Sequence, residues 1–364
     1  MKKILCINTG GIGNLHGLRM RRLADGIRAD VIYHDLDKTV SRWQQAQQTW
    51  QLLRSQQWDL VYQEGSGIGA GASLIRAYWS WKQPFIVSSG DPIGGFFHVT
   101  KGALWGALFG VYEKALYRSC KAFVGWTPYL TGAALQLGAR RGITIEGAVD
   151  LNIFTRFEQS RRLALKRQYG IPDHHLVCGV VGKMSWNANH GYCYGWEMVE
   201  TLKKIQRQDI SLLIVGDGTG QAYLERAIPA SLKSRVVFTG RIPEDEVVNA
   251  MNAMDIGFVT QTLDRLGLYR LTTKLPEYLA CGLGVAMSPI PGFYDYVNVA
   301  GWALPPYHPA SETFHQHCAD WLDQVTWEEI ELLSQQALRI ASDRFDYGVL
   351  RPRFQAFVHN LLDI

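Results

Sequence analysis

Residues 272–287, Thr-Thr-Lys-Leu-Pro-Glu-Tyr-Leu-Ala-Cys-Gly-Leu-Gly-Val-Ala-Met, combine a short helix signal with an apolar strand signal. Thr272 or Thr273 can cap the helix start, where backbone N–H groups and the helix dipole attract phosphate. Lys274 adds a full positive charge there. Glu277, one turn in, can accept hydrogen bonds from ribose hydroxyls or complete a capping box. The stretch predicts either a nucleotide-phosphate site or an ordinary capped helix.

Strand and helix signals alternate along most of the chain, which predicts parallel sheets covered by helices on both faces. We expect an α/β fold of two doubly wound, Rossmann-like domains, residues 1–155 and 170–345, that face each other across a cleft. A last helix at 346–364 is expected to pack back on the first domain. Ligands in such sheets bind at the carboxyl ends of the strands, so each domain can hold one substrate of a group transfer. The expected strands are 3–8, 30–34, 59–63, 85–88, 122–125 and 143–146, then 177–181, 212–215, 236–239, 256–259 and 284–287.

The composition excludes several classes of protein. The net charge of +4, from 37 basic and 33 acidic residues, is too small for a typical nucleic-acid binder. The six cysteines form no C-x-x-C pair, so we expect free thiols in a reducing compartment. No stretch has the features of a signal peptide or of a membrane span. We therefore predict a cytoplasmic protein, which either stays free or rests peripherally on the inner face of the membrane.

A glycine-rich loop with Gly10, Gly11 and Gly13 joins the first strand to the first helix. Glycines let the backbone approach a ligand, although a plain tight turn has the same composition. An NAD-dependent oxidoreductase would use this loop together with Asp35. The G-x-G-x-x-G fingerprint of such enzymes, if it started at Gly11, would need a glycine where His16 stands. The oxidoreductase hypothesis also gives the second domain no role.

Two groups of residues have a superficial likeness to metal sites. Asp35-Leu36-Asp37 is the only D-x-D in the chain, and it follows the second expected strand. His315, His317 and Cys318 lie on an expected helix with a polar face. We interpret the first as a solvated loop and the second as surface residues, and we predict no metal and no cofactor.

Five segments of the chain resemble, in order and spacing, those of retaining GT-B glycosyltransferases of family four, the glycosyl transferases group 1. The stretch 272–287 is similar to the donor-site helix of that family, which typically reads K-L-x-E-Y/A-M-A-x-G-x-P-V. The resemblance covers most of the chain and is most specific in its second half. The other segments are Glu146–Asp150, Val181–Ser185, Leu213–Gly218 and Val237–Pro243.

The resemblance implies a role for each matching residue. Lys183 stands where a phosphate-binding arginine is usual, and His190 stands where a lysine is usual. Glu277 matches the carboxylate that holds the donor ribose. The glycine loop with Gly10, Gly11 and Gly13 would face the donor phosphates and the acceptor across the cleft. The remaining donor-binding residues implied are Gly216 in the second strand-end loop, Arg241 and Ile242 beside the base, Leu271, Thr272 and Thr273 as backbone donors to the diphosphate, and Lys274 and Leu275 at the helix start.

Two departures from the family pattern affect the predicted site. The family usually carries a second glutamate, which contacts the sugar, but Tyr269 occupies that position here. Either Tyr269 or Arg270 could substitute for it. The family also supplies a histidine after the fourth strand, where this chain has Asp91. Asp91 is therefore a catalytic candidate, and a turn residue before proline is the equal alternative.

Together these features predict a metal-independent hexosyltransferase. It would move a sugar from a UDP- or GDP-sugar to a sugar or lipid-linked acceptor, with retention of configuration. Lys183 and Lys274 would stabilise the negative charge that develops on the departing diphosphate. The alternatives are a non-catalytic relative that binds nucleotide-sugar, an epimerase or hydrolase on the same fold, and the NAD-dependent oxidoreductase.

Residues 102–118 are apolar on nearly every helical face, with Phe96 and Phe97 before them and Lys101, Lys114, Arg118 and Lys121 around them. A membrane-facing helix and a groove for a lipid-linked acceptor both have this composition. So does a helix buried between layers of a domain. We favour burial, because large apolar side chains are usually inside.

Overall fold

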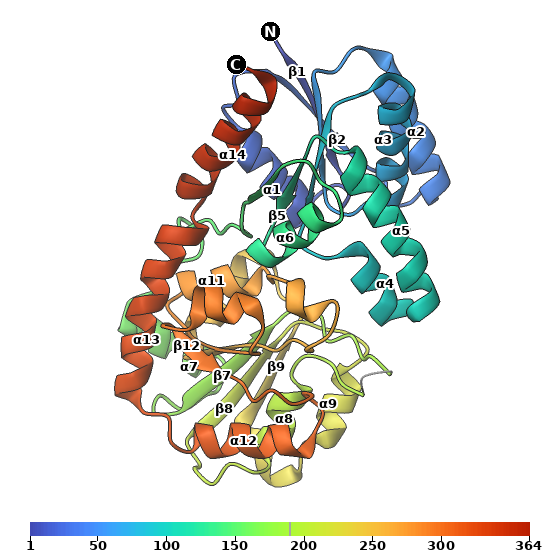
Figure 1. Ribbon diagram of the computed structural model, residues 1–364. Coiled ribbons are helices and arrows are strands. Elements are labelled where there is room, and N and C mark those ends of the chain that lie inside the picture. Colours follow the sequence, from blue (N-terminus) through green and yellow to red (C-terminus); the bar gives the residue numbers. More distant parts are fainter. Residues whose placement is uncertain (189–190) are drawn as a thin grey trace. The chain divides into compact units, whose positions relative to one another are not determined.

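The computed structural model describes residues 1–188 and 191–364, and its chain divides into two compact units (Figure 1). The first unit comprises Met1–Ala148, Tyr269–Leu271 and Arg344–Ile364. The second comprises Val149–Leu268 and Thr272–Asp343. Each unit has one six-stranded parallel sheet, which confirms the predicted pair of doubly wound α/β domains.

The first sheet has the strand order β2-β1-β3-β4-β5-β6. Its central strands are buried along their whole length, which explains why they read as continuous apolar runs. The strands are β1 (Lys3–Asn8), β2 (Asp30–Asp35), β3 (Leu60–Glu64), β4 (Phe85–Ser89), β5 (Ala122–Gly125) and β6 (Gly142–Thr144). The helices are α1 (Leu15–Ala24), α2 (Arg42–Ser55), α3 (Ile68–Trp81), α4 (Ile93–Lys101), α5 (Ala103–Ser119), α6 (Pro128–Gln136) and α14 (Tyr347–Leu362).

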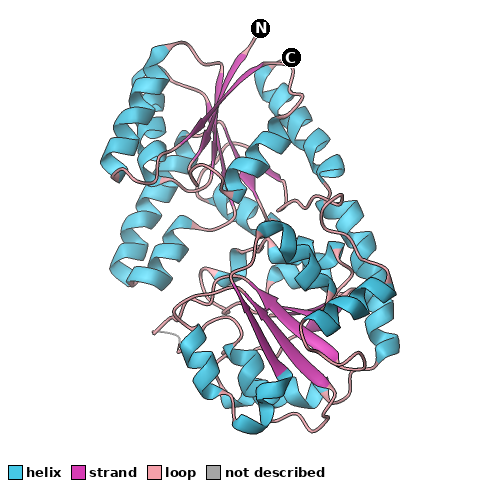
Figure 2. Cartoon of the chain, turned by 180° about the vertical axis from the view of Figure 1, so that it is seen from behind, coloured by secondary structure: helices cyan, strands magenta, loops and turns pink. Residues whose placement is uncertain are grey.

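Helices cover both faces of this sheet (Figure 2). Alternate strand residues point to opposite faces, so Leu5 and Val87 pack with Leu74 of α3 and Leu116 of α5. On the other face, residues of β1 and β3 pack with α1 and with the C-terminal helix α14. The final helix therefore completes the core of the first unit, although it is more than 200 residues distant in sequence.

The second sheet has the order β12-β11-β10-β7-β8-β9. Its strands are β7 (Leu176–Val181), β8 (Ile210–Val215), β9 (Val236–Gly240), β10 (Ile256–Val259), β11 (Gly284–Met287) and β12 (Gly301–Ala303). Its α-helices are α7 (Gln159–Gln168), α8 (Trp196–Leu202), α9 (Gln221–Ala227), α10 (Val247–Asn252), α11 (Lys274–Ala280), α12 (Glu312–Leu322) and α13 (Trp327–Ile340). Five short 3-10 or π turns are η1 (Ala230–Arg235), η2 (Glu244–Glu246), η3 (Gly267–Tyr269), η4 (Phe293–Val297) and η5 (Ala341–Phe345).

The strand orders fix where a ligand is expected in each unit. The direction of winding reverses between β1 and β3 in the first sheet and between β7 and β10 in the second. Neighbouring loops diverge at such a switch point and leave room for a ligand outside the carboxyl ends of the strands. A ligand is therefore expected beside Asn8 and Glu64, the last residues of β1 and β3, in the first unit. In the second unit it is expected beside Val181 and Val259, the last residues of β7 and β10.

All six cysteines are buried and free. Burial raises the thiol pKa at each of them, so none is an activated nucleophile. Within residues 1–188 and 191–364, no helix combines the length and the apolar character needed to cross a membrane.

Candidate functional site

Lys274 lies at the carboxyl end of β7 in the second unit. Its ammonium nitrogen is 3.5 Å from the ring centroid of Tyr194, a cation–π distance. A Cβ atom placed on Gly182 would lie 2.9 Å from Lys274 Cε and 3.2 Å from its Nζ. The ammonium group therefore rests against the backbone of Gly182, and Lys183 is the next residue. Lys274 thus lies beside the backbone that leads into Lys183, although the two lysines are 91 positions apart in sequence.

Helix α11 holds Lys274 at this edge because the rest of the helix is anchored in the core. Leu275, Tyr278 and Leu279 are fully buried. The Tyr278 hydroxyl accepts a hydrogen bond of 2.9 Å from the backbone N–H of Val181, the last residue of β7. Gly257 of β10 leaves room for the Tyr278 ring, since an added Cβ would lie 2.5 Å from it. Shortening Tyr278 would release the helix that positions Lys274.

No side chain caps the start of α11. Glu277 does not fold back on the helix end, so the capping-box interpretation of this stretch is wrong. The Oγ1 atom of Thr272 is buried and has no hydrogen-bond partner among the described atoms. A buried hydroxyl without a partner is costly, and a bound polar ligand would relieve that cost.

Glu277 has a strongly shifted protonation equilibrium. Burial in the protein raises the pKa of its carboxyl from 4.5 to about 8, Lys274 opposes the rise, and Glu244 adds to it. The folded protein thus retains a proton that the unfolded chain has lost. The resulting cost to stability is absent below about pH 4.5 and grows as the pH rises towards 8. A strained titratable group beside a lysine is typical of a functional site.

The loops that follow β7 and β8 touch through their backbones. Gly216 has φ +122°, and a Cβ on it would overlap the carbonyl oxygen of Gly182. The N–H of Met184 donates to the carbonyl oxygen of Asp217 at 2.9 Å, and the N–H of Gly220 donates to Met184 O at 2.7 Å. Only glycine fits at position 216, so Gly216 secures the shape of the loops that follow β7 and β8.

The other predicted residues of the second unit differ in how far they are exposed to solvent. Lys183 and Arg241 are exposed, Ile242 and Thr273 are half-buried, and the side chain of Leu275 belongs to the core. His190 lies outside the described residues.

Sequence reasoning missed a buried polar group beside Lys274. Glu197 of α8 is fully buried and accepts a 2.7 Å hydrogen bond from Thr260, which follows β10. Burial raises the Glu197 carboxyl pKa. Gln261 donates to the Tyr194 hydroxyl at 3.1 Å. These residues lie at the β7–β10 switch point, and no motif identifies them because only the strand order brings them together.

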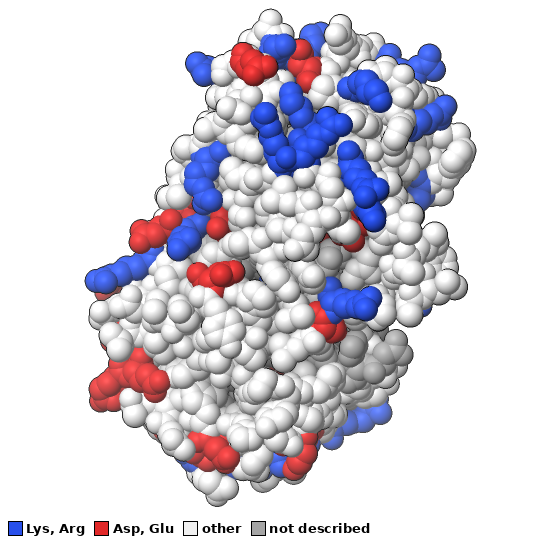
Figure 3. Space-filling view, in the orientation of Figure 1, with Lys and Arg blue, Asp and Glu red and all other residues white. Residues whose placement is uncertain are grey.

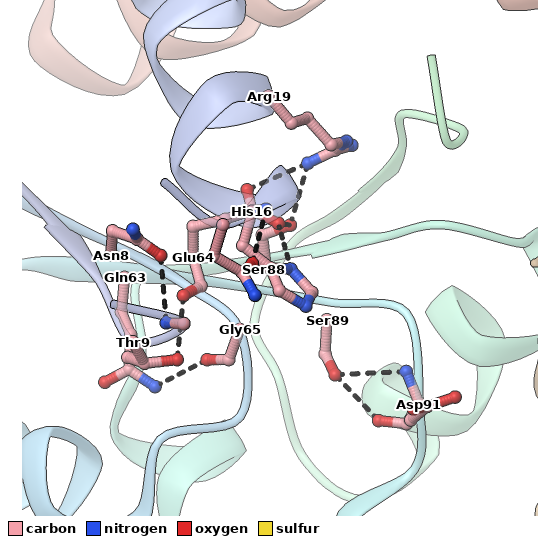
Figure 4. Close-up of polar contacts among 12 residues, drawn as sticks. Asn8, Thr9, His16, Arg19, Gln63, Glu64, Gly65, Ser88, Ser89 and Asp91 are labelled. Atoms are coloured by element: carbon pink, nitrogen blue, oxygen red, sulfur yellow. Dashed lines mark hydrogen bonds and ion pairs between the residues drawn. The ribbon is translucent and has the colours of Figure 1, made fainter. Parts of the chain in front are cut away.

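A buried charged cluster occupies the corresponding edge of the first unit (Figure 4). Glu64, the last residue of β3, accepts a 2.8 Å hydrogen bond from Arg19 of α1 and one of 3.0 Å from Ser88 of β4. The Tyr62 hydroxyl also donates to it. Although burial opposes ionisation, Arg19 and His16 bring the net pKa of Glu64 below its usual value. The cluster is a neutral ion pair under the β1–β3 switch point.

His16 lies on the outer edge of this cluster. Its Nδ1 atom is 3.8 Å from Glu64 Oε1, and its ring lies 5.5 Å from that of Trp126. Nδ1 is buried without a hydrogen-bond partner among the described atoms, while about a third of the side chain is exposed. A ring with one nitrogen turned to a carboxylate presents its other nitrogen outward. The sequence gives no sign of this pair, because Glu64 lies 48 residues after His16.

The glycine-rich loop is held by Asn8, which closes β1. The Asn8 side chain donates to Gly11 O at 2.7 Å and accepts from Gly10 N at 2.9 Å. Asn14 caps α1, and Gly13 is exposed at the tip of the loop. The loop is therefore a fixed turn beside His16.

Both carboxylates of the D-x-D stretch are bound by other groups of the chain. Asp35 pairs with Arg21 at 2.6 Å and accepts from Asn8 at 2.7 Å. Asp37 caps a turn at Thr39. Among the residues that the structure describes, no cluster of three or more histidine, cysteine or acidic side chains could hold a metal ion.

Asp91 and the segment 269–271 come together in the first unit. Arg270 donates to Asp91 Oδ1 at 2.7 Å. The ring of Tyr269 stacks on that of Tyr129 at 4.6 Å, and Tyr269 O accepts from Thr127 at 3.0 Å. Leu271 packs against Gly147. The position where the family pattern has glutamate thus belongs, by its contacts, to the first unit.

Part of the second unit is similar to a known protein family. Residues 175–324 match the family described as glycosyl transferases group 1. The 2-deoxystreptamine glucosyltransferase of Streptomyces kanamyceticus is 32% identical over 136 residues, which make up 37% of this chain and 33% of that relative. The chain therefore matches about a third of that relative's length.

Two solved structures cover nearly the whole chain. HepE of Anabaena, in complex with UDP and glucose, has a TM-score of 0.76 and 19% identity, and the match covers 99% of this chain and 100% of that one. Sucrose-phosphate synthase of Thermosynechococcus elongatus has a TM-score of 0.75 and 13% identity over all of both chains. At such identities the likeness shows the fold. Residues 175–324 are thus similar to the glycosyl transferases group 1, and the whole chain has the GT-B fold that these solved structures share.

Proposed function

We propose that the protein is a retaining glycosyltransferase that takes a hexosyl group from a UDP- or GDP-sugar bound by its second unit. The main support is the contact of Lys274 with Gly182, the residue before Lys183, at one strand edge, with Glu277 one turn along the helix of Lys274. That edge lies within the segment that matches the family. The structure of HepE with UDP-glucose makes a uridine donor the first to test.

The chemistry assigned to these residues is electrostatic. As the bond between the anomeric carbon and the diphosphate oxygen breaks, negative charge grows on the leaving nucleoside diphosphate. Lys274 and Lys183 stabilise that charge where it develops. The acceptor hydroxyl oxygen forms the new bond to the anomeric carbon, and its proton passes to the departing diphosphate. Glu277 holds the ribose, and no step requires a metal ion.

The acceptor side of the proposal concerns the first unit. The carboxyl edge of its sheet carries His16 and the fixed glycine loop at the switch point and Asp91 after β4, which are groups suited to sugar hydroxyls. The acceptor is a free sugar or cyclitol, as the name of the Streptomyces relative suggests, or a lipid-linked sugar. Asp91 remains a catalytic prediction, now with Arg270 bound to its carboxylate.

A donor screen followed by a transfer assay tests the function. UDP-, GDP- and ADP-sugars are compared with NAD by thermal shift, and the best donor is then incubated with 2-deoxystreptamine, simple hexoses and a polyprenyl-linked sugar. We expect stabilisation by a UDP- or GDP-sugar, none by NAD, and product formation that persists in EDTA. Donor binding without turnover on any acceptor would instead identify a non-catalytic relative. Loss of activity in EDTA that Mg²⁺ restores would contradict the metal-free mechanism.

Nucleotide binding should depend on pH through Glu277. Its pKa of about 8 leaves the carboxyl mostly protonated at pH 7, whereas accepting bonds from both ribose hydroxyls needs the ionised form. Between pH 7 and 9 the UDP affinity should rise about tenfold, above the range where phosphate itself titrates near 6. Calorimetric titrations at several pH values measure this. Glu277→Gln should bind weakly with a flat profile, and an unchanged slope in that variant would refute the assignment.

His16→Ala should raise the KM for the acceptor about tenfold, the cost of one lost hydrogen bond of about 1.4 kcal/mol. The donor KM should not change, because the donor is assigned to the other unit. His16→Gln, which can present an oxygen, should recover part of the loss, and exposed His174→Asn is the control. Equal acceptor KM values for wild type and His16→Ala would remove His16 from the site.

A further inference from the structure

Helices α4 and α5 form an antiparallel hairpin in the first unit, joined at Gly102 (Figure 1). The two helices approach each other closely at two glycines, which have no Cβ atom. A Cβ placed on Gly94 would lie 3.1 Å from Gly110 Cα, and one placed on Gly106 would lie 2.6 Å from His98 Cβ. The buried carboxylate of Glu113 accepts from the N–H groups of Ile93 and Gly94 at 2.8 and 3.0 Å. The hairpin is therefore a rigid element with a fixed outer surface.

The outer surface of α5 is an uninterrupted apolar stripe, which we call the α5 stripe. Leu104, Leu108 and Val111 are spaced at i, i+4 and i+7, and their exposed fractions are 82%, 59% and 69%. Trp105 of α5 and Phe96 of α4 are also exposed. The sequence-based preference for a helix buried between layers is therefore wrong for this side of the helix.

The opposite side of α5 already provides the packing that the fold needs. Leu116 and Tyr117 are fully buried in the core of the first unit. Phe109 stacks on Phe97 with ring centroids 3.7 Å apart and fills the space between the two helices. Since the core and the hairpin are complete without them, the stripe residues contribute exposed apolar area that folding does not explain.

The charges around the stripe are positive. Lys101 ends α4, while Lys114 and Arg118 continue the line of the stripe along α5, and all three are exposed. Glu113 is the only acidic residue in 93–119, and it is buried. The first unit as a whole carries 21 basic and 11 acidic residues, a net +10, whereas the second carries 16 and 22, a net −6. Figure 3 shows Lys and Arg gathering over the face of the first unit that is in view.

We infer that the α5 stripe docks on an anionic membrane surface, with Leu104, Trp105 and Leu108 in the interface and Lys101, Lys114 and Arg118 at the headgroups. Apolar residues bordered by cations match the chemistry of such a surface. A second copy of the chain fits less well, because a pairing of two stripes would bring like charges together. The inference goes beyond the transfer reaction, and docking of this kind would bring the protein to the membrane in which a lipid-linked acceptor resides.

Vesicle co-sedimentation of the full chain tests this inference. We expect binding to vesicles of phosphatidylcholine with 30% phosphatidylglycerol, weak binding to phosphatidylcholine alone, and weakening by salt. Leu104→Glu with Leu108→Glu should reduce the affinity at least tenfold, and Lys101→Glu with Lys114→Glu severalfold. The matched control is Leu332→Glu with Val349→Glu, two exposed apolar residues on α13 and α14, which should bind as wild type does.

Other results would overturn the inference. They are absence of wild-type binding, equal binding by the stripe variant, or a dimer in sedimentation velocity that the stripe variant abolishes. UDP binding and circular dichroism are measured on every variant. Lost vesicle binding with intact UDP binding therefore reports on the stripe, whereas absence of UDP binding in the wild type would count against the proposed function alone.

Discussion

Lys274→Ala should lower the transfer rate about 100- to 1000-fold, the usual cost of removing one group that stabilises charge in a transition state. The ammonium lies over the Tyr194 ring and against Gly182, so alanine at this position removes the positive charge from the β7 edge. Helix α11 is anchored by its buried residues, and the variant should therefore remain folded. Steady-state kinetics with the donor found in the screen measures the effect.

The control for this prediction is Lys203→Ala. Lys203 is a lysine of the same unit that pairs with Glu200 on the surface of α8, so its loss should leave kinetics unchanged. Lys274→Arg separates charge from geometry: a guanidinium keeps the charge but not the compact shape, and it should restore only part of the rate. A rate for Lys274→Ala within threefold of wild type would show that the leaving group is stabilised elsewhere.

Arg19→Met should destabilise the protein by about 3–5 kcal/mol, the cost of leaving a buried charge without its partner. Glu64 has no exposed surface, and Arg19 is its only full cationic partner with a short contact among the described residues. Arg19 also donates to the carbonyl oxygen of Ile145 at 2.6 Å and so links α1 to the strand-end loop after β6. Urea unfolding followed by circular dichroism measures the loss.

Removing both members of this pair should cost less than removing one. Arg19→Met with Glu64→Gln leaves no unpaired charge, so we expect its unfolding midpoint to lie between those of wild type and Arg19→Met. Arg167→Met, which breaks the exposed pair with Asp173, is the control and should not shift the midpoint measurably. A double variant less stable than the single one would show that the side chains matter for packing rather than for charge.

The sequence predicts most of the fold because its elements are locally consistent. The run Lys3–Asn8 alternates with a helix whose stripe begins at Met20, and such βα repeats leave few arrangements other than a doubly wound sheet. Strand limits agree closely, as for β7 and β8. Tyr269–Leu271 could not be placed from sequence, because their contacts with Thr127 and Gly147 are tertiary.

The candidate site was partly predictable for a similar reason. Lys274, Gly216 and Glu277 stand in motifs whose local chemistry identifies them. Tyr194 and Glu197 have no such motif, since the order β10-β7 brings them to Lys274. In the first unit, pairing of β1 with β3 brings Glu64 under His16 in the same way.

The α5 stripe was mispredicted because periodicity cannot distinguish a buried helix from one with a second exposed apolar side. Burial is a sound expectation for Leu104 and Leu108 on average. These two residues remain exposed because α4 and the core cover only part of the circumference of α5. The hydrogen bond of Glu113 and the close glycine contacts determine which side of α5 packs against α4.

The most direct test of the donor site is a calorimetric titration of UDP into the wild-type protein, Lys274→Ala and Lys203→Ala. If the β7 edge of the second unit binds a nucleoside diphosphate, wild type and Lys203→Ala should show the same one-to-one binding, and Lys274→Ala should bind at least tenfold more weakly. Equal affinity in all three proteins, or no binding of UDP or GDP to wild type, would contradict the assignment of the donor to this edge.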